Sequence, residues 1–167
     1  MKNVIKKIYR KSNQIFSCLI IGLLVSAVLN AAVCQTVEVS GSSMEPTFHD
    51  GNKLLMEKIS YRFRFPERFD VIVFPRNGNY FLIKRIIGMP NETVFIDSAG
   101  NIFVDGQVLE ENYGMEEISD AGLAGKTVTL GDNEYFVLGD NRNASMDSRS
   151  EKIGNVRLED ITGKIMR

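Results

Sequence analysis

Residues 139–149 read G-D-N-R-N-A-S-M-D-S-R and directly follow an apolar, strand-like segment, Tyr135–Leu138. These eleven residues include two Asp, two Arg, two Ser and two Asn. So many polar groups at the end of a strand indicate a fixed network of hydrogen bonds and charges rather than a solvated loop. The stretch therefore predicts an ordered polar site at the end of a β-strand.

Short strands are predicted along the rest of the chain, because apolar runs alternate with turn signals such as Asp50-Gly51 and Asn77-Gly78. The stretch S-Y-R-F-R-F at 60–65 also alternates, with aromatic rings on one face and arginines on the other. Residues 108–125 are polar and irregular, which predicts a surface excursion with a short helix. Strands at this spacing predict a mainly β fold, either a barrel or a folded sheet. The other predicted strands are 37–40, 53–56, 70–74 (closed by Pro75), 80–87, 93–96, 102–104 and 127–130.

The N-terminal region predicts a membrane anchor. No residue from Ser12 to Gln35 is charged, and the apolar run within this segment has about the length of a membrane-spanning helix, roughly 20 residues. All five charges before it are positive, which predicts a cytoplasmic N-terminus. We therefore expect a cytoplasmic basic tail at 1–12, a single transmembrane helix at 13–35 in the cell membrane, and an extracytoplasmic catalytic domain at 36–167 with a small β insertion at about 91–134.

Two other interpretations of this segment are open. A cleaved secretory signal would also have a basic head, an apolar middle and small residues such as Ala31 and Ala32. A lipoprotein signal would end at Cys34, although Val33 is a poor residue directly before such a cysteine. The run is longer than a usual signal core, and no spacer separates it from the first strand, so a retained anchor is favoured.

Charge and cysteine content exclude some classes of function. Without the five basic residues of the tail, the chain has 15 basic and 21 acidic residues, a formal net charge of −6, which argues against a nucleic-acid partner. Cys18 and Cys34 lie at opposite ends of the predicted anchor and are the only cysteines. A disulfide framework or metal cluster is therefore not expected, and we expect no metal and no cofactor.

Lys84 and Ser43 are the candidate base and nucleophile. Along its predicted strand, Lys84 shares a face with Leu82 and Ile86. Burial without a counter-charge lowers the pKa of a lysine, so that a neutral amine can act as a general base. Ser43 follows a strand that ends in glycine, on a turn stiffened by Pro46, and a serine hydroxyl needs an adjacent base to become a nucleophile. A snorkelling or acid-paired lysine is the alternative.

The single histidine offers a less suitable base. His49 begins a His-Asp-Gly turn six residues after Ser43. A Ser-His-Asp triad needs a freely placed imidazole with a carboxylate behind it. We expect His49 to be an exposed turn residue, which leaves Lys84 as the better base.

Three motifs together resemble the type I signal peptidases of bacteria, the serine proteases that remove leader peptides from exported proteins. The motifs are S-G-S-S-M-E-P-T at 40–47, I-K-R-I-I-G-M-P at 83–90 and the stretch at 139–149, in the order and spacing of that family. The resemblance implies a signal-peptidase or repressor-protease-like folded β-sheet, with Ser43 as nucleophile and Lys84 as general base. It also implies supporting roles for Ser145, whose hydroxyl would bond the lysine amine, and for Asp147, Arg149, Asp140 and Arg142.

Two positions depart from the family pattern. One branch of the family has an oxyanion-binding serine at the position of Gly41. Enzymes of Gram-positive type have a glycine there, as this chain does. The oxyanion would then depend on the backbone N–H of Ser43, with Ser42 as a helper. Asn143-Ala144 replaces a commoner Asp-Asn pair, which keeps hydrogen-bonding capacity but removes a charge. We expect a tuned site. Lys84 excludes the branch that uses histidine as base.

The resemblance also implies the substrate and its binding mode. Two shallow apolar pockets would accept small side chains, so that cleavage follows Ala-X-Ala-like sites in translocated preproteins. The leader would add as a strand beside residues 37–39 and 81–83. The signal peptide, the lipid bilayer and the protein-export translocon are the expected partners. Apolar residues expected to line the substrate site are Val37, Val39, Met44, Leu54, Val73, Leu82 and Ile83.

Other functions would share parts of this pattern. A self-cleaving repressor also uses serine and lysine, but it would need a DNA-binding domain and a soluble chain. An inactive signal-peptidase-like factor for pilus or surface-protein assembly typically lacks the nucleophile or the base, and both are present here. A peptidase dedicated to one substrate, such as a pilin, stays open beside general export.

Overall fold

The computed structural model describes residues 14–23, 33–76 and 80–166. The chain divides into two units, Met1–Gln35 and Thr36–Arg167. In the first unit, residues 14–23 are helical and expose large apolar side chains, among them Phe16 and Leu23. No helix within the described residues has the length and hydropathy of a membrane span. The predicted tail at 1–12 and a large part of the predicted anchor, residues 13 and 24–32, lie outside the described residues.

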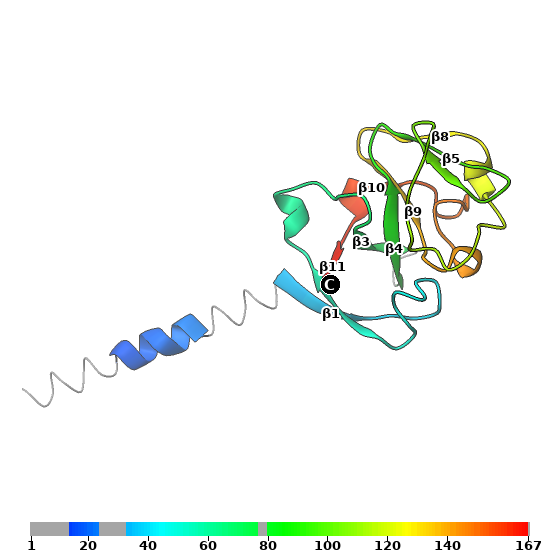
Figure 1. The fold of residues 1–167 in the computed structure, drawn as a ribbon. Helices are drawn as coiled ribbons and strands as arrows, with labels where there is room; N and C mark the ends of the chain where they lie inside the picture. Colours follow the sequence, from blue (N-terminus) through cyan, green and yellow to red (C-terminus); the bar gives the residue numbers. More distant parts are fainter. Residues whose placement is uncertain (1–13, 24–32, 77–79, 167) are drawn as a thin grey trace, which may run out of the picture. The chain divides into compact units, whose positions relative to one another are not determined.

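A seven-stranded sheet forms the larger part of the second unit (Figure 1). β1 (Cys34–Glu38) and β2 (Lys53–Glu57) flank the loop that carries Ser43, and β4 carries Lys84. The described strand order is β1-β2-β11-β3-β4-β9-β10. The remaining bounds are β3 (Val71–Arg76), β4 (Tyr80–Gly88), β9 (Glu134–Leu138), β10 (Val156–Arg157) and β11 (Gly163–Ile165).

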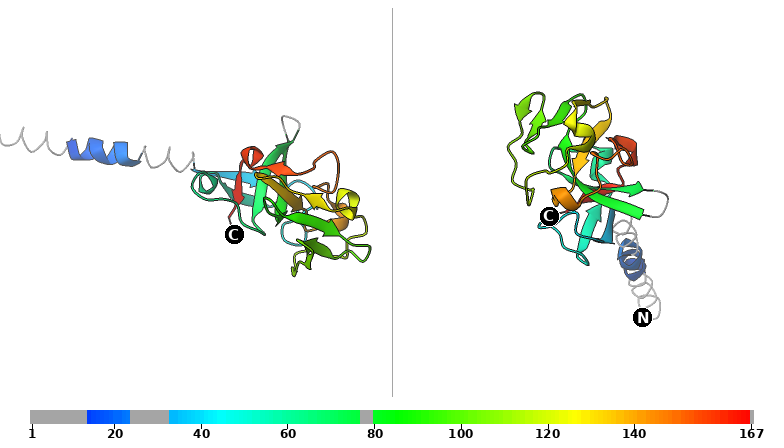
Figure 2. Two further views of the ribbon diagram at one scale, coloured as in Figure 1. Left: turned by 90° about the horizontal axis from the view of Figure 1, so that it is seen from above. Right: turned by 90° about the vertical axis from the view of Figure 1, so that its right-hand side faces the viewer.

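A second, four-stranded sheet has the order β7-β6-β5-β8. Its strands are β5 (Thr93–Ile96), β6 (Ile102–Val104), β7 (Gln107–Val108) and β8 (Val128–Thr129). β5 and β6 form the predicted hairpin, with Ile96 opposite Ile102. This sheet and its connections occupy one end of the second unit in both views of Figure 2. The prediction of a mainly β fold is therefore confirmed.

Three apolar clusters hold the second unit together. One joins the small sheet to β4 and β9 through fully buried residues such as Ile87, Val94 and Phe136. A second lies between β3, β4 and β9, around Ile72 and Val137. Burial of such side chains stabilises the fold by about 1.5–3 kcal/mol each. The third cluster packs Met44 of the Ser43 loop against β2, β3 and β11, so that core packing fixes the loop beside the sheet.

The observed strands differ from the sequence pattern at three places. The first strand is Cys34–Glu38 rather than 37–40, so it begins inside the predicted transmembrane helix of 13–35. Residues 60–62 form the 3-10 helix η1 (Ser60–Arg62) rather than a strand, and Phe63 and Phe65 are exposed. The alternation mimics a strand, but turn hydrogen bonds such as Phe63 N to Ser60 O (3.0 Å) form instead of a ladder. β3 also continues through Pro75, which pairs with Phe81, where the sequence predicts an end.

Candidate active site

Ser43 lies on a loop whose ends are tied together. The N–H of Val39 donates to Asn52 O and that of Gly51 donates to Val39 O, both at 2.9 Å. Gly41 has φ +89°, and its N–H donates to Asp50 Oδ1 at 2.7 Å. Glycine adopts this left-handed conformation without the steric cost that a serine would incur. The backbone of this turn thus explains why a glycine stands two residues before Ser43.

Lys84 lies within β4, opposite Ile72 of β3, and is 2% exposed. Its Nζ is 2.7 Å from Ser43 Oγ. That distance is within hydrogen-bond reach for direct proton transfer between the two side chains. The structure thus brings together the two residues that the sequence singles out as nucleophile and base.

Burial lowers the pKa of Lys84 to about 8, because the charged amine loses its hydration. The carboxylates of Asp147 and Asp140 oppose this effect, and the guanidinium of Arg149 reinforces it. A lysine with this pKa is neutral in a substantial fraction of molecules just below pH 8. The amine is therefore able to accept a proton from Ser43 at near-neutral pH.

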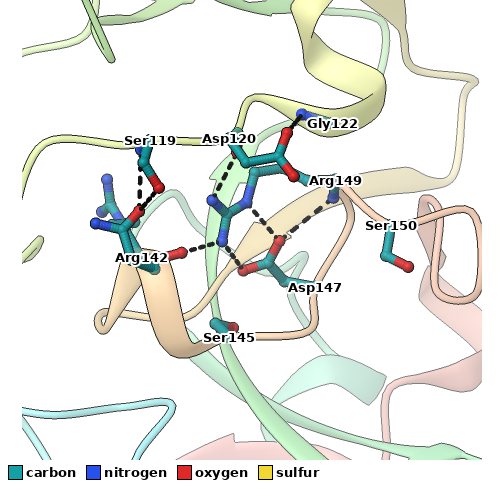
Figure 3. A pocket seen from close by; sticks show the side chains of 9 residues that line it. Ser119, Asp120, Gly122, Arg142, Ser145, Asp147, Arg149 and Ser150 are labelled. Atoms are coloured by element: carbon teal, nitrogen blue, oxygen red, sulfur yellow. Dashed lines mark hydrogen bonds and ion pairs between the residues drawn. The ribbon is translucent and has the colours of Figure 1, made fainter.

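Asp147 and Arg149 form a buried pair beside Lys84. Arg149 Nε lies 2.8 Å from Asp147 Oδ1, and Nη2 donates to Oδ2 at 2.9 Å. Asp147 Oδ2 also accepts from the N–H of Gly139 at 3.1 Å. Figure 3 shows the Arg149 guanidinium between Asp147 and the segment that carries Asp120, whose carbonyl accepts from Nη1 at 3.0 Å. The pair therefore fixes the loop and sets part of the field at Lys84.

Asp140 pairs with Arg85, the chain neighbour of Lys84. Arg85 Nε and Nη2 donate to the two oxygens of Asp140 at 2.8 and 2.6 Å, and both side chains are at most 1% exposed. Thr47 Oγ1 donates to Asp140 Oδ2 at 2.5 Å. The N–H of Asn141 donates to Ser43 O at 3.1 Å. These contacts tie the Ser43 loop to β4 and to the 139–149 stretch.

The expected hydrogen bond from Ser145 to the amine of Lys84 is not formed in this structure. Ser145 Oγ is buried and has no partner among the described residues. It lines a pocket of about 260 Å³ together with Asp147 and Arg149, shown in Figure 3. A Cβ at Gly139 would meet both Ser145 Oγ and Ser43 O. Ser145 is therefore close to the backbone of Ser43, but its hydroxyl is not bonded to the Lys84 amine.

Arg142 and Asn143 contact the 108–125 excursion rather than Ser43 and Lys84. Arg142 Nη1 is 2.7 Å from Glu111 Oε1, with side chains 3% and 9% exposed. Asn143 Oδ1 accepts from the N–H and Oγ of Ser119 at 2.9 and 2.8 Å. Its Nδ2 donates to Glu116 Oε2 and to Glu117 O at 2.8 and 3.0 Å. An aspartate at 143 could not make the last two bonds, which gives a physical reason for the asparagine.

The oxyanion candidates lie at the exposed side of the loop. No described residue accepts a hydrogen bond from the backbone N–H of Ser43, which leaves this donor available to a bound group. Ser42 is exposed, and its carbonyl accepts from the N–H of Glu45 at 3.1 Å. His49 is exposed, and its Nδ1 lies 3.5 Å from Glu45 Oε1, which confirms the prediction of a surface turn residue.

The candidate substrate residues do not all line a surface. Met44 and Val73 are at most 1% exposed and belong to the core cluster of the Ser43 loop. Val39 is also buried, and Leu82 packs against a different cluster. The partly exposed members that pack beside Met44 are Val37, Leu54 and Ile83, so these three, together with the partly exposed Leu82, remain the candidates for contact with a ligand.

Strand pairing leaves two edges near the dyad. β1 is the first strand of the sheet and pairs with β2 alone among described strands. β9 pairs with β4 from Arg85 to Gly88, whereas β4 residues 80–84 have a ladder with β3 on one side. Among the described strands none pairs with the other side of residues 81–83, which leaves backbone groups close to Lys84 available there.

Sequence reasoning missed several residues that build this site. Arg85 shares the apolar strand context of Lys84, and that context could have indicated a buried guanidinium with an acidic partner. Thr47 ends the motif at 40–47, but the sequence does not predict its contact with Asp140. Glu111 and Ser119 lie outside all three motifs, and nothing in their local sequence indicates that they contact the polar stretch.

Comparisons with known proteins agree with this geometry. The profile of the family described as "Signal peptidase, peptidase S26" matches residues 12–167. The chain is 42% identical over 123 residues to the probable signal peptidase I-2 of a Synechocystis species, covering 70% of this chain and 55% of that protein. It is 34% identical over 157 residues to signal peptidase I V of Bacillus subtilis, covering 87% of this chain and 92% of that protein.

A solved structure shares the fold. The crystal structure of a signal peptidase I from Enterococcus faecalis aligns with a TM-score of 0.51 and 32% identity, covering 62% of this chain and 98% of that chain. The resemblance inferred from the three motifs is thus confirmed, as is the prediction of a serine endopeptidase of this type. The chain belongs to the signal peptidase family, peptidase S26.

Proposed function

We propose that this protein removes signal peptides from exported preproteins by acyl transfer through a Ser43–Lys84 dyad. The observation that carries the proposal is the 2.7 Å distance between Lys84 Nζ and Ser43 Oγ, at an amine whose pKa burial lowers to about 8. Neutral Lys84 takes the hydroxyl proton as Ser43 Oγ attacks the scissile carbonyl. The amine then returns this proton to the leaving amino group, and water hydrolyses the acyl-enzyme.

Backbone donors stabilise the tetrahedral intermediate in this mechanism. The N–H of Ser43 points to no described acceptor, and Ser42 adds a hydroxyl nearby in sequence. One oxyanion donor contributes about 2.7–4 kcal/mol to transition-state stabilisation in comparable sites. Since Gly41 has no side chain, the backbone N–H is the main donor.

The leader binds as an added strand in our proposal. Within the part of the sheet that the structure describes, β1 and residues 81–83 of β4 offer free strand edges, and Val37, Leu54 and Ile83 are partly exposed beside them. Main-chain hydrogen bonds supply affinity, and shallow apolar contacts favour small side chains at the first and third positions before the cut. The substrate sites would accordingly be of Ala-X-Ala type.

A membrane location fits the same proposal. The uncharged run of residues 12–35 and the exposed apolar side chains of the 14–23 helix support an anchor that keeps the catalytic unit outside the cytoplasm. There the cleavage site of a translocated leader emerges. The bilayer and the translocon are the partners that this location implies.

The test is cleavage of a preprotein by the full chain in detergent. Wild type should cut after an Ala-X-Ala site, and Ser43→Ala or Lys84→Ala should each abolish cleavage. Loss of a dyad member typically lowers turnover by about 10⁴-fold or more. Full activity in either variant would reject the dyad, and a panel of leaders separates general export from a dedicated substrate.

A further inference from the structure

The 108–125 excursion places a carboxylate against the buried arginine of the 139–149 stretch. Glu111 Oε1 is 2.7 Å from Arg142 Nη1, and the two side chains are 9% and 3% exposed. Glu111 Oε2 accepts from the N–H of Tyr113 at 2.9 Å, which holds the carboxylate in place. Arg142 Nη2 has no partner among the described residues. Glu111 is thus the counter-charge that the structure records for this cation.

Arg142 acts on the backbone next to the nucleophile. Its Nε donates to Gly139 O at 3.0 Å. Gly139 packs so closely on the Ser43 carbonyl that an added Cβ would collide with it. The carbonyl of Arg142 also accepts from Arg149 Nη2, and Arg149 holds Asp147 beside Lys84. A displaced Arg142 would therefore disturb both halves of the dyad.

The same short segment supports a second buried arginine. The ring of Tyr113 lies 3.7 Å from Arg85 Cζ in a cation–π contact. Arg85 in turn donates hydrogen bonds to both carboxylate oxygens of Asp140. Residues 111–113 therefore contact two buried arginines. Glu111 pairs with Arg142, and Tyr113 covers Arg85, the residue that follows Lys84 in β4.

We propose that Glu111 is a positioning residue of the active site, which fixes Gly139 and the Ser43 loop through Arg142. A buried cation that loses its counter-charge turns toward water or destabilises its surroundings. Without Glu111, Arg142 leaves Gly139, and the contact between residues 139–141 and the Ser43 carbonyl loosens. The catalytic part of this inference rests on the proposed function, and its structural part does not.

The first experiment separates positioning from substrate binding. Glu111→Ala should lower kcat by about 10–100-fold with KM within about twofold of wild type, because an interaction remote from the bound leader is lost. Glu111→Gln keeps one acceptor oxygen, which can still face Arg142 while the bond from the Tyr113 N–H is lost, and it should lower kcat by only about threefold. Glu110→Ala and Glu110→Gln are matched controls, since Glu110 is exposed and makes no described side-chain contact. Both controls should retain wild-type kcat.

The second experiment tests the positioning role by amide hydrogen exchange, which needs no activity assay. The N–H of Asn141 donates to Ser43 O, and that of Thr162 donates to Val73 O in the main sheet. In Glu111→Ala, exchange of the Asn141 amide should accelerate by about tenfold more than that of Thr162, because local opening adds to global unfolding. Where Glu111→Ala does not fold, the same ratio measured in Glu111→Gln against Glu110→Gln decides.

Either of two results would overturn the proposal: a kcat for Glu111→Ala within about twofold of Glu110→Ala, or an unchanged ratio of Asn141 to Thr162 exchange. A wild-type chain that cleaves no leader would reject the proposed function alone. The exchange ratio would then still decide whether Glu111 positions the loop.

Discussion

Arg85 and Asp140 form a two-pronged ion pair at 2.8 and 2.6 Å, fully enclosed by protein. Arg85 also donates to Phe69 O at 2.9 Å, and Asp140 accepts from Thr47. The pair therefore links β4, the Ser43 loop and the polar stretch 139–149 at one point.

Arg85→Met should lower the free energy of unfolding by about 3–5 kcal/mol, because the substitution leaves Asp140 buried without a counter-charge. Arg157 pairs with Glu159 at 2.9 Å on the surface, with both side chains at least 60% exposed. Arg157→Met should cost only about 0–1 kcal/mol. Urea denaturation of both full-length variants in detergent measures the difference, and equal costs would contradict the structural role of the pair.

Activity should fall as the pH drops below about 8, because Lys84 with its lowered pKa then gains a proton and cannot act as base. The acid limb of kcat/KM should have a slope of one, so that activity near pH 6 is about 100-fold below its plateau. Circular dichroism over the same pH range controls for unfolding. A flat profile between pH 9 and 6 would exclude Lys84 as the titrating base.

Ser145→Ala should separate stability from turnover. Its Oγ is buried without a described partner, so its removal should leave the melting temperature unchanged or raise it. Turnover should fall by about 10²-fold or more if the hydroxyl orients the Lys84 amine during the reaction. Preprotein cleavage and thermal melting test the two parts. A variant with wild-type turnover would remove Ser145 from the mechanism.

Gly139→Ala should inactivate the protein without unfolding it. The added Cβ would collide with Ser43 O and Ser145 Oγ, and a displacement of the nucleophile by about 1 Å can cost 10²-fold in rate. Gly125→Ala is the control, since its Cβ would meet Ala121 Cβ at 3.6 Å, an ordinary contact. Cleavage rates and far-UV spectra of the two variants suffice, and an active Gly139→Ala would show that the Ser43 loop moves freely.

Asn143→Asp should loosen the excursion, because a carboxylate at 143 loses two donated bonds and faces the carboxylate of Glu116. Proteolytic nicking within residues 108–125 should become faster by about fivefold. Asn112→Asp makes the same chemical change at an exposed position without a described side-chain bond. The double variant Asn143→Asp/Glu116→Gln should recover resistance, and its failure to do so would point away from charge repulsion.

The sequence predicts the part of this site that local pattern encodes. A lysine flanked by isoleucines and leucine within a strand indicates burial, with a snorkelling or acid-paired lysine as the alternative, and the turn after a strand indicates an accessible Ser43. The partners of the charged residues cannot be predicted in this way. Arg85, Glu111 and Thr47 contact the polar stretch through tertiary packing, which leaves no periodic pattern in the local sequence. The direction of the Ser145 hydroxyl likewise depends on a side-chain rotamer.

Strands are likewise predictable only where the local sequence is long enough to show a pattern. Tyr80–Ile87 is predicted almost to its observed ends, because a long apolar run between turn signals has few alternatives. The short strands β10 and β11 have too few residues to show a period, and their place in the sheet is set by partners far away in the chain. The aromatic alternation at 60–65 finds no partner strand and folds locally instead.

The position of β11 has a consequence for biosynthesis. Within the described sheet, this strand is the link between β2, beside the Ser43 loop, and β3, beside the strand of Lys84. A ribosome delivers both groups of the dyad some eighty residues before it delivers Gly163–Ile165. We therefore expect the sheet that brings Ser43 and Lys84 together to be completed only after β11 has emerged from the ribosome, and a stop codon before Gly163 should prevent that assembly.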